Sequence, residues 1–314
     1  VERIAEGLQL PLTRVETRPM REHSPEDIER ILTDGLHFFD GRCSHNMGAF
    51  SETYTRDYKL RVLGPHRLSL SGLGGEVFRN YYFTCRRRVN LRDWMDRHVY
   101  YPFARETTPD GDLFEEMHRH RMRKIGNRLD VDFMGKTATL LDLRRYYSEV
   151  RMPDCDGANN NAHNQVAFFH TPFFDPDVIR EGLCATPYIG CDGLYQARLI
   201  QMLDPRLAAY PSHYGHAFDR VPAGYLARCW LRGKLPDRLT LERVRRVSRR
   251  RGQAWLPSFM AFVENTPVLS QIKSVLEDAF LRDRFERAML DYAQRPTTIF
   301  LGSFLLQYQH KLKW

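Results

Sequence analysis

The chain has 314 residues, of which 42% are hydrophobic and 27% are charged, and its formal net charge is +8. This composition is ordinary for a globular protein, and the length allows a sizeable core in one large domain or two. No apolar run approaches the roughly 20 residues that cross a bilayer, so we expect no membrane partner. Six scattered cysteines without a C-x-x-C pair favour reduced thiols and a cytoplasmic location.

The N-terminal part predicts helices and short strands. Apolar residues at helical spacing begin directly after Val1 without a capping residue, so we expect the chain to start inside a helix and to be incomplete at this end. Leu8 to Thr17 predicts a helix end followed by a strand. Ser24 and Pro25 are typical of a helix start, and a further helix is predicted from Phe50 to Leu63.

A glycine-rich turn follows the next predicted strand. The strand covers Arg67 to Leu70, the turn is Ser71-Gly-Leu-Gly-Gly-Glu76, and Val77 to Tyr82 is expected to begin a helix. Glycines let the backbone approach a ligand closely and adopt positive φ. Amides ahead of a helix N-terminus attract anionic oxygens, and a carboxylate such as Glu76 can hold a metal ion or accept a proton.

The rest of the chain predicts helices interrupted by polar stretches. Asn90 to Tyr147 has a charged helical pattern, and Asp175 is expected to cap a helix that starts near Pro176. Pro153 to Asn161 is either a plain loop or the lining of a polar pocket, because Asn offers both a donor and an acceptor. The alternation of strands and helices predicts an α/β fold, a parallel sheet flanked by helices, with ligand groups at the strand ends.

The basic charge suggests nucleic acid, but its distribution does not favour that partner. The run Arg243 to Arg251 also carries valines at helical spacing, which is more typical of a solvated helix face than of an RNA-binding surface. We therefore expect a largely helical C-terminal region over residues 221–314 and do not favour nucleic acid as a partner.

Three segments, in the same order and at similar spacing, resemble the asparagine synthetase-like family. The resemblance covers about Val1 to Pro211. In that family a strand ends in Ser-Gly-x-Gly-x-Asp/Glu, and an Asn-bearing helix later leads into a Pro-Phe-Leu-Asp corner. The matching segments here are Ser71 to Glu76 with Phe78 and Tyr81, Ala158 to Asn164 followed by Pro172 to Asp175, and Gly193 to Leu203 followed by Asp204-Pro205.

The resemblance implies an adenine nucleotide alpha-hydrolase-like (PP-loop ATP pyrophosphatase) domain over residues 1–220, with the helical extension packed on it. It implies an ATP- and Mg²⁺-dependent ligase that adenylates a small-molecule carboxylate and then lets ammonia or an amine form the amide. A glutaminase domain or subunit is an implied partner, as in amidotransferases. The implied site residues are Ser71, Gly72, Gly74 and Gly75 for phosphate, Glu76 for catalysis and Mg²⁺, and Asn159 and Asn160 for the substrate carboxylate.

Two departures from the family keep other functions open. The family's first signature, Ser-Gly-Gly-x-Asp-Ser, is absent, and we expect it in a missing N-terminal segment. The later helix has Arg198 but no lysine, and Gly157 stands where the family has an arginine, so the substrate need not be aspartate. The alternatives are a catalytically degenerate binding or scaffold module, or a basic PP-loop relative that acts on RNA.

Overall fold

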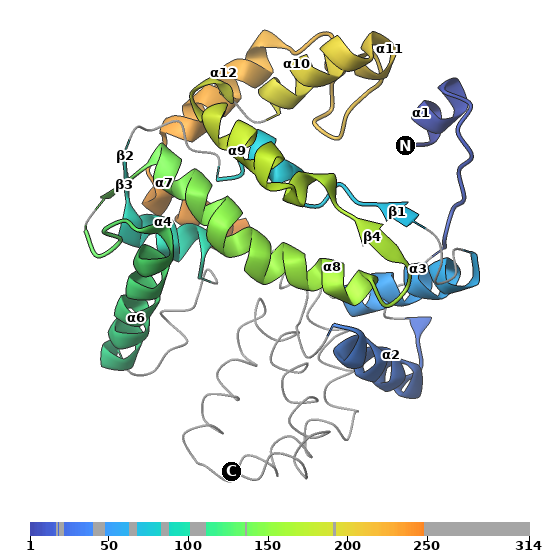
Figure 1. Ribbon diagram of the computed structural model, residues 1–314, viewed down its shortest axis with the longest axis horizontal. Helices are drawn as coiled ribbons and strands as arrows, with labels where there is room; N and C mark the ends of the chain where they lie inside the picture. The colour runs from blue at the N-terminus through green and yellow to red at the C-terminus, as the bar shows by residue number, and fades with distance from the viewer. Residues whose placement is uncertain are drawn as a thin grey trace.

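The computed structural model describes residues 1–16, 18, 22–39, 48–62, 68–82, 88–100, 111–135, 137–190 and 193–247. Most of these residues are helical, as Figure 1 shows. None of the described helices is long and apolar enough to cross a membrane. The expected strand within Leu8 to Thr17 is wrong for residues 10–16, which form no regular structure. Thr17 lies outside the described residues.

The helices of the N-terminal part confirm their sequence signals. The Ser24 side chain accepts a hydrogen bond from the Asp27 amide at 3.1 Å, and Pro25 occupies the first turn of the helix that follows. These two features fix the helix start. The Ser24 side chain accepts from a first-turn amide that has no partner within the helix, and Pro25 has no amide hydrogen that would need one. The helices are α1 (Glu2–Gly7), α2 (Pro25–Phe38) and α3 (Gly48–Val62), of which α2 and α3 pack together.

Parallel pairing is present but limited to a few residues. Strand β1 (Leu68–Leu70) pairs in parallel with β4 (Phe168–His170), with Leu68 opposite Phe168. Helix α8 contacts β4, and Lys59 of α3 lies 5.2 Å from the centroid of the Phe169 ring, so helices adjoin this pair (Figure 1). The predicted α/β fold is therefore confirmed in part: the parallel pair lies among helices, and no larger parallel sheet is found among the described residues.

A second strand pair has one strand at the start of the region that was predicted to be helical and the other inside it. Strand β2 (Arg88–Asn90) pairs with β3 (Thr137–Thr139) in antiparallel orientation, and only Val89 and Ala138 of the two strands are buried. A three-residue strand with one buried position shows too little alternation of apolar and polar residues to be recognised in the sequence beside helical segments. The helices of this region are α4 (Leu91–His98), α6 (Gly111–Leu129) and α7 (Leu140–Arg145).

One continuous helical run carries the chain from α7 to α8 (Figure 1). Between them, the π-helix η3 (Tyr146–Asp156) contains Pro153, and α8 follows (Gly157–His163). The polar stretch Pro153 to Asn161 is thus helical rather than a loop. Proline removes one backbone donor from the helix ladder, and it lies within the segment that has the wider π-type winding.

The C-terminal described part is helical, as expected. Asp175 caps its helix with hydrogen bonds from the amides of Asp177 (2.8 Å) and Val178 (3.3 Å), which confirms the predicted start at Pro176. Residues 237–247 form a further helix, while 248–314 lie outside the described residues. The remaining elements are the short 3-10 helices η2 (Gly75–Phe78), η4 (Pro172–Phe174) and η5 (Thr186–Tyr188), and α9 (Pro176–Cys184), α10 (Leu194–Leu203), α11 (Pro205–Ala208) and α12 (Ala223–Lys234).

The main hydrophobic core joins the glycine turn to the long helical run. It consists of side chains from η2, β2, α4, α6, β3, α7 and η3, with Trp94 and Leu143 fully buried at its centre. Val77, directly after Glu76, is 1% exposed and belongs to this core. The turn is therefore anchored to the core from its C-terminal side.

Gly74 gives the first test of this packing. Its φ is +84°, and a Cβ there would lie 2.9 Å from the Phe174 ring, whereas a Cβ at Gly72 would meet nothing within 4 Å. We expect Gly74→Ala to lower the free energy of unfolding by about 2 kcal/mol through left-handed strain and the clash. The control Gly72→Ala should lose clearly less in urea unfolding. Equal losses would contradict the packing account.

Candidate functional site

The glycine turn leaves β1 at the carboxyl end of the parallel pair. The Ser71 amide donates to the His170 carbonyl at 2.9 Å, which extends the ladder by one residue. Within the turn, the Leu73 amide donates to the Ser71 hydroxyl at 3.2 Å, and the Gly75 amide donates to the Gly72 carbonyl at 3.2 Å. The amides of Ser71 and Gly75, both expected to bind phosphate, are thus already hydrogen-bonded to backbone carbonyls. The amides of Gly72 and Gly74 donate no hydrogen bond within the described part of the chain.

The surroundings of the three glycines in the turn differ. Gly74 needs its positive φ and its closeness to Phe174, and a Cβ at Gly75 would already touch Phe173 at 3.4 Å. Gly72 has open space beside it and is exposed to solvent. Gly72 is therefore the position where a ligand oxygen can approach the backbone without displacing a side chain.

Glu76 shares one phenol with a second carboxylate. The Tyr147 hydroxyl lies 3.1 Å from Glu76 Oε2 and also 3.1 Å from Asp156 Oδ2. Tyr147 is 3% exposed, whereas Glu76 and Asp156 are half-buried, so the carboxylates face solvent more than the phenol that joins them. Sequence reasoning missed both Tyr147 and Asp156.

Burial and charge shift the titration of this group. Burial, with the nearby charges of Asp156 and Glu76, raises the pKa of the Tyr147 hydroxyl well above its usual range, so it remains a donor at neutral pH. Burial also raises the pKa of Asp156. The hydrogen bond from Tyr147 opposes that shift, and the charge of Glu76 adds to it.

The asparagines lie on the helix that follows Asp156. Asn160 Oδ1 accepts a hydrogen bond from the Thr171 hydroxyl at 2.8 Å, and Thr171 is the first residue after β4, as Ser71 is the first after β1. Asn159 and Asn160 are three and four residues after Asp156, which is the spacing of neighbours on one helix face. The structure thus brings Asn160 to the strand ends and Glu76 to Asp156.

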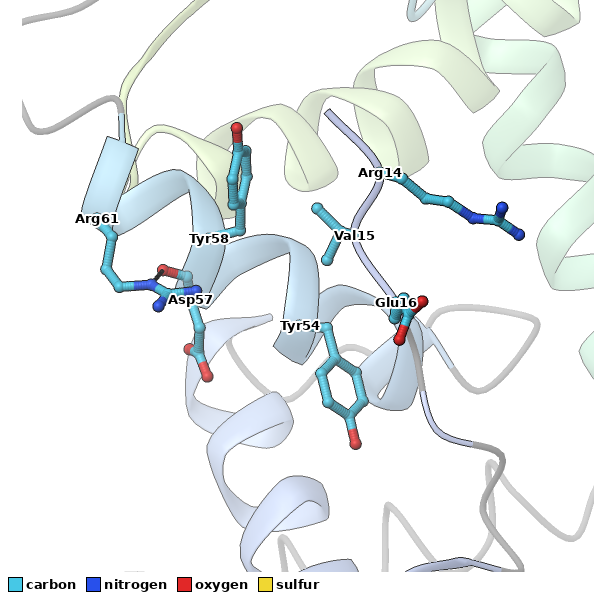
Figure 2. Close-up of a pocket in the computed structure, with 7 residues that line it drawn as sticks. All are labelled: Arg14, Val15, Glu16, Tyr54, Asp57, Tyr58 and Arg61. Carbon is cyan, nitrogen blue, oxygen red and sulfur yellow. Dashed lines mark hydrogen bonds between the residues drawn. The ribbon is translucent and has the colours of Figure 1, made fainter. Parts of the chain in front are cut away.

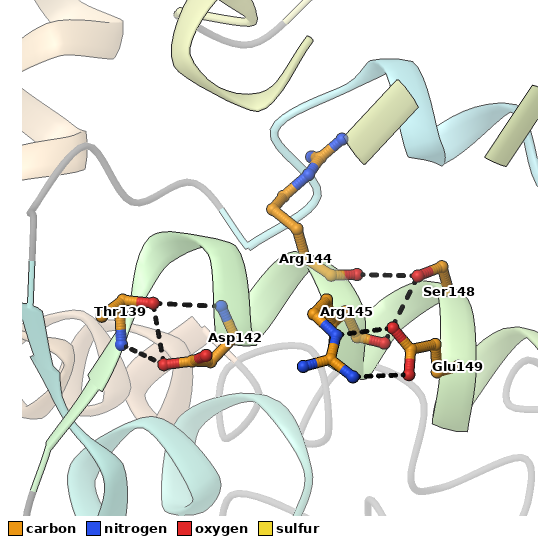
Figure 3. Close-up of polar contacts among 6 residues, drawn as sticks. All are labelled: Thr139, Asp142, Arg144, Arg145, Ser148 and Glu149. Atoms are coloured by element: carbon orange, nitrogen blue, oxygen red, sulfur yellow. Dashed lines mark hydrogen bonds and ion pairs between the residues drawn. The ribbon is translucent and has the colours of Figure 1, made fainter. Parts of the chain in front are cut away.

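Buried Arg144 fixes the turn from behind. Its guanidinium donates hydrogen bonds to the carbonyls of Val77 and Arg79, and the side chain is 4% exposed. Burial lowers the pKa of Arg144 to about 10, which leaves it charged at neutral pH. Figure 3 shows Arg144 pointing away from Arg145, which instead pairs with Glu149 at 2.7 Å near the surface.

Two arginines complete the charge balance. Arg79 Nη2 lies 3.6 Å from Glu76 Oε1. The guanidinium groups of Arg79 and Arg151 lie 5.9 Å and 5.1 Å from the centroid of the Tyr81 ring. Acidic and basic groups therefore meet on one side of the turn, an arrangement suited to a metal-bound phosphate ligand and an anionic substrate.

A separate hollow of about 580 Å³ lies between α3 and residues 14–16 (Figure 2). None of the sequence-predicted site residues lines it. Its rim carries two cations and two acids, so it favours no particular charge of ligand. The hollow is lined by Arg14, Val15, Glu16, Tyr54, Asp57, Tyr58 and Arg61.

Among the described residues, no group of three or more His, Cys, Asp or Glu side chains is arranged to hold a metal ion. Comparison with protein-family models, with curated proteins and with solved structures finds no match for this chain. The features that bear on function are the turn, its carboxylates and the resemblance described above.

Arg144 and Arg145 offer a matched pair of variants. Arg144→Met leaves the buried Val77 carbonyl without its donor and removes one of two donors to the Arg79 carbonyl, which keeps the Tyr81 amide at 2.9 Å. It should lower the free energy of unfolding by about 3 kcal/mol. Arg145→Met breaks only a half-exposed ion pair and should cost less than about 1 kcal/mol. Urea unfolding measures both, and similar losses would show that the turn does not depend on Arg144.

Asp156→Asn tests the raised pKa. The pKa of Asp156 is higher in the folded chain than its ordinary value of 3.8, which applies to the unfolded chain, so the folded chain holds this proton more tightly. The contribution of Asp156 to the free energy of unfolding therefore falls as the pH rises from about 3.8 through the folded-state pKa. Asn keeps an oxygen for Tyr147 but carries no such proton. The melting temperature of Asp156→Asn relative to the parent chain should therefore rise as the pH increases from about 4 through the folded-state pKa of Asp156, and then level off. A constant difference across this range would contradict the shift.

Proposed function

We propose that this chain is an ATP-dependent amide-forming ligase of the asparagine synthetase-like type. The observation that carries the proposal is the position of the glycine turn and Glu76 at the carboxyl end of a parallel strand pair. In open α/β sheets, nucleotides bind at this end of the strands. The proposal includes a larger parallel sheet of the PP-loop kind within residues 1–220, with residues 221–314 as a helical extension.

The turn would bind phosphate oxygens through its N-terminal half. Gly72 leaves the backbone accessible, and the amides of Gly72 and Gly74 are not used by neighbouring groups in the described part of the chain. Ser71 and Gly75 would act mainly by shaping the turn, since their amides close the ladder and the turn. Backbone amides of this kind stabilise negative charge that develops on leaving pyrophosphate.

The carboxylates fit the Mg²⁺ that such a reaction requires. Mg²⁺ is commonly held by one or two carboxylates together with substrate phosphates, and Glu76 and Asp156 supply two half-buried carboxylates beside the turn. Bound there, Mg²⁺ would neutralise the charge of the phosphate groups. Glu76 is the proposed ligand and catalytic residue, with Asp156 beside it.

The chemistry consists of two displacements. An oxygen of the substrate carboxylate attacks the α-phosphorus of ATP, and pyrophosphate leaves. Ammonia or an amine then attacks the activated carbonyl carbon, AMP leaves, and the nitrogen loses a proton. Asn159 and Asn160 would orient the carboxylate through amide hydrogen bonds, and a glutaminase domain or subunit is the proposed source of ammonia.

Pyrophosphate release from ATP and Mg²⁺ tests the proposal. The full-length gene product is assayed with a panel of small carboxylates, beside Glu76→Ala and the control Glu149→Ala, an acid of η3 that pairs with Arg145. Release should require a particular carboxylate, fall about 100-fold or more in Glu76→Ala, and persist in Glu149→Ala.

Two other outcomes would contradict the proposal. Absence of release, with no ATP binding by calorimetry, would favour a degenerate binding module. Release that is unchanged in Glu76→Ala would remove Glu76 from the reaction.

A further inference from the structure

Tyr147 does more than fill the core. Its ring packs in the main hydrophobic core, with the Tyr81 ring centroid 5.1 Å away, and this packing alone requires no hydroxyl. The hydroxyl nevertheless reaches both Glu76 and Asp156 at 3.1 Å. A phenol has one hydrogen to donate, so Glu76 and Asp156 share that hydrogen.

The π-helix is what brings Tyr147 and Asp156 together. The two residues are nine apart. In an α-helix with 3.6 residues per turn, nine residues make about two and a half turns and put the side chains on opposite faces. A π-helix has roughly 4.4 residues per turn, so nine residues make about two turns and return to the same face. The unusual winding of η3 thus builds the contact.

Tyr146 shows that burial on this helix does not demand such partners. Tyr146 precedes Tyr147 in the sequence and is 8% exposed. Its ring packs edge-to-face on Trp94, with the ring centroids 5.1 Å apart. Its hydroxyl makes no hydrogen bond within the described part of the chain. The two tyrosines therefore share burial and differ in what their hydroxyls contact.

We propose that Tyr147 is a positioning residue for Glu76. It holds Oε2 of Glu76, while Oε1 pairs with Arg79 Nη2 at 3.6 Å, so the carboxylate keeps one orientation toward a divalent cation. By binding Asp156 at the same time, it keeps the second carboxylate beside the first. This inference rests on the proposed function of Glu76, because it concerns the same cation.

Mn²⁺ binding measured by electron paramagnetic resonance tests the proposal without turnover. The full chain is titrated with Mn²⁺ in the presence of ATP, beside Tyr147→Phe, Tyr146→Phe and Glu76→Ala. Each phenylalanine keeps the ring and removes only the hydroxyl, and thermal unfolding checks that both variants fold. Tyr147→Phe should weaken Mn²⁺ binding by the chain about tenfold, as for loss of a hydrogen bond to a charged group, while Tyr146→Phe should bind like the parent.

The outcomes separate this inference from the function on which it rests. If Glu76→Ala loses Mn²⁺ binding but Tyr147→Phe does not, the positioning role is overturned and Glu76 remains a ligand. If the parent chain does not bind Mn²⁺, or Glu76→Ala binds like the parent, the role of Glu76 fails and the inference fails with it.

Turnover adds a second readout where pyrophosphate is released. Tyr147→Phe should lower kcat about tenfold and raise the Mg²⁺ concentration for half-maximal rate, with little change in the KM of the carboxylate. A purely structural role would instead lower the melting temperature and leave the Mg²⁺ dependence unchanged.

Discussion

The geometry of the candidate site depends on the buried guanidinium of Arg144. Val77 lies in the last turn of the 3-10 helix η2 and Arg79 directly follows it, and carbonyls at such an end lack partners within the helix. Buried carbonyls require donors, and a guanidinium supplies several in one rigid plane. Because Arg144 comes from α7, this contact ties the turn to a helix more than 60 residues later. Glu76, one residue before Val77, is thereby fixed relative to that helix.

The long helical run then serves the site at successive positions. Arg144 supports the turn, Tyr147 and Asp156 meet Glu76, and Asn160 reaches Thr171 at the end of β4. A uniform α-helix would not present Tyr147 and Asp156 on one face, whereas the π-helical segment does. The widened winding is therefore part of the construction of the site, and it coincides with a proline that cannot donate to the ladder.

The glycine-rich motif combines structural and functional requirements. Gly74 is explained by its left-handed backbone and by Phe174, whereas a Cβ at Gly75 would make only an ordinary contact with the Phe173 ring. Gly72 has no such neighbour, so packing does not explain this glycine and a ligand can approach its backbone. The motif is thus compatible with a phosphate-binding turn, but one of its three glycines, Gly74, is also needed for packing.

Local signals in the sequence determined the helix starts at Ser24 and Asp175, the strand before Ser71 and the sharp turn after it. These depend on contacts between residues a few positions apart, namely caps, proline and glycine, which the sequence displays directly. The pairing of β2 with β3 and the meeting of Glu76 with Asp156 were decided by the tertiary structure. Each depends on groups brought together across long chain separations, where burial and unsatisfied hydrogen bonds, rather than local preference, select the conformation.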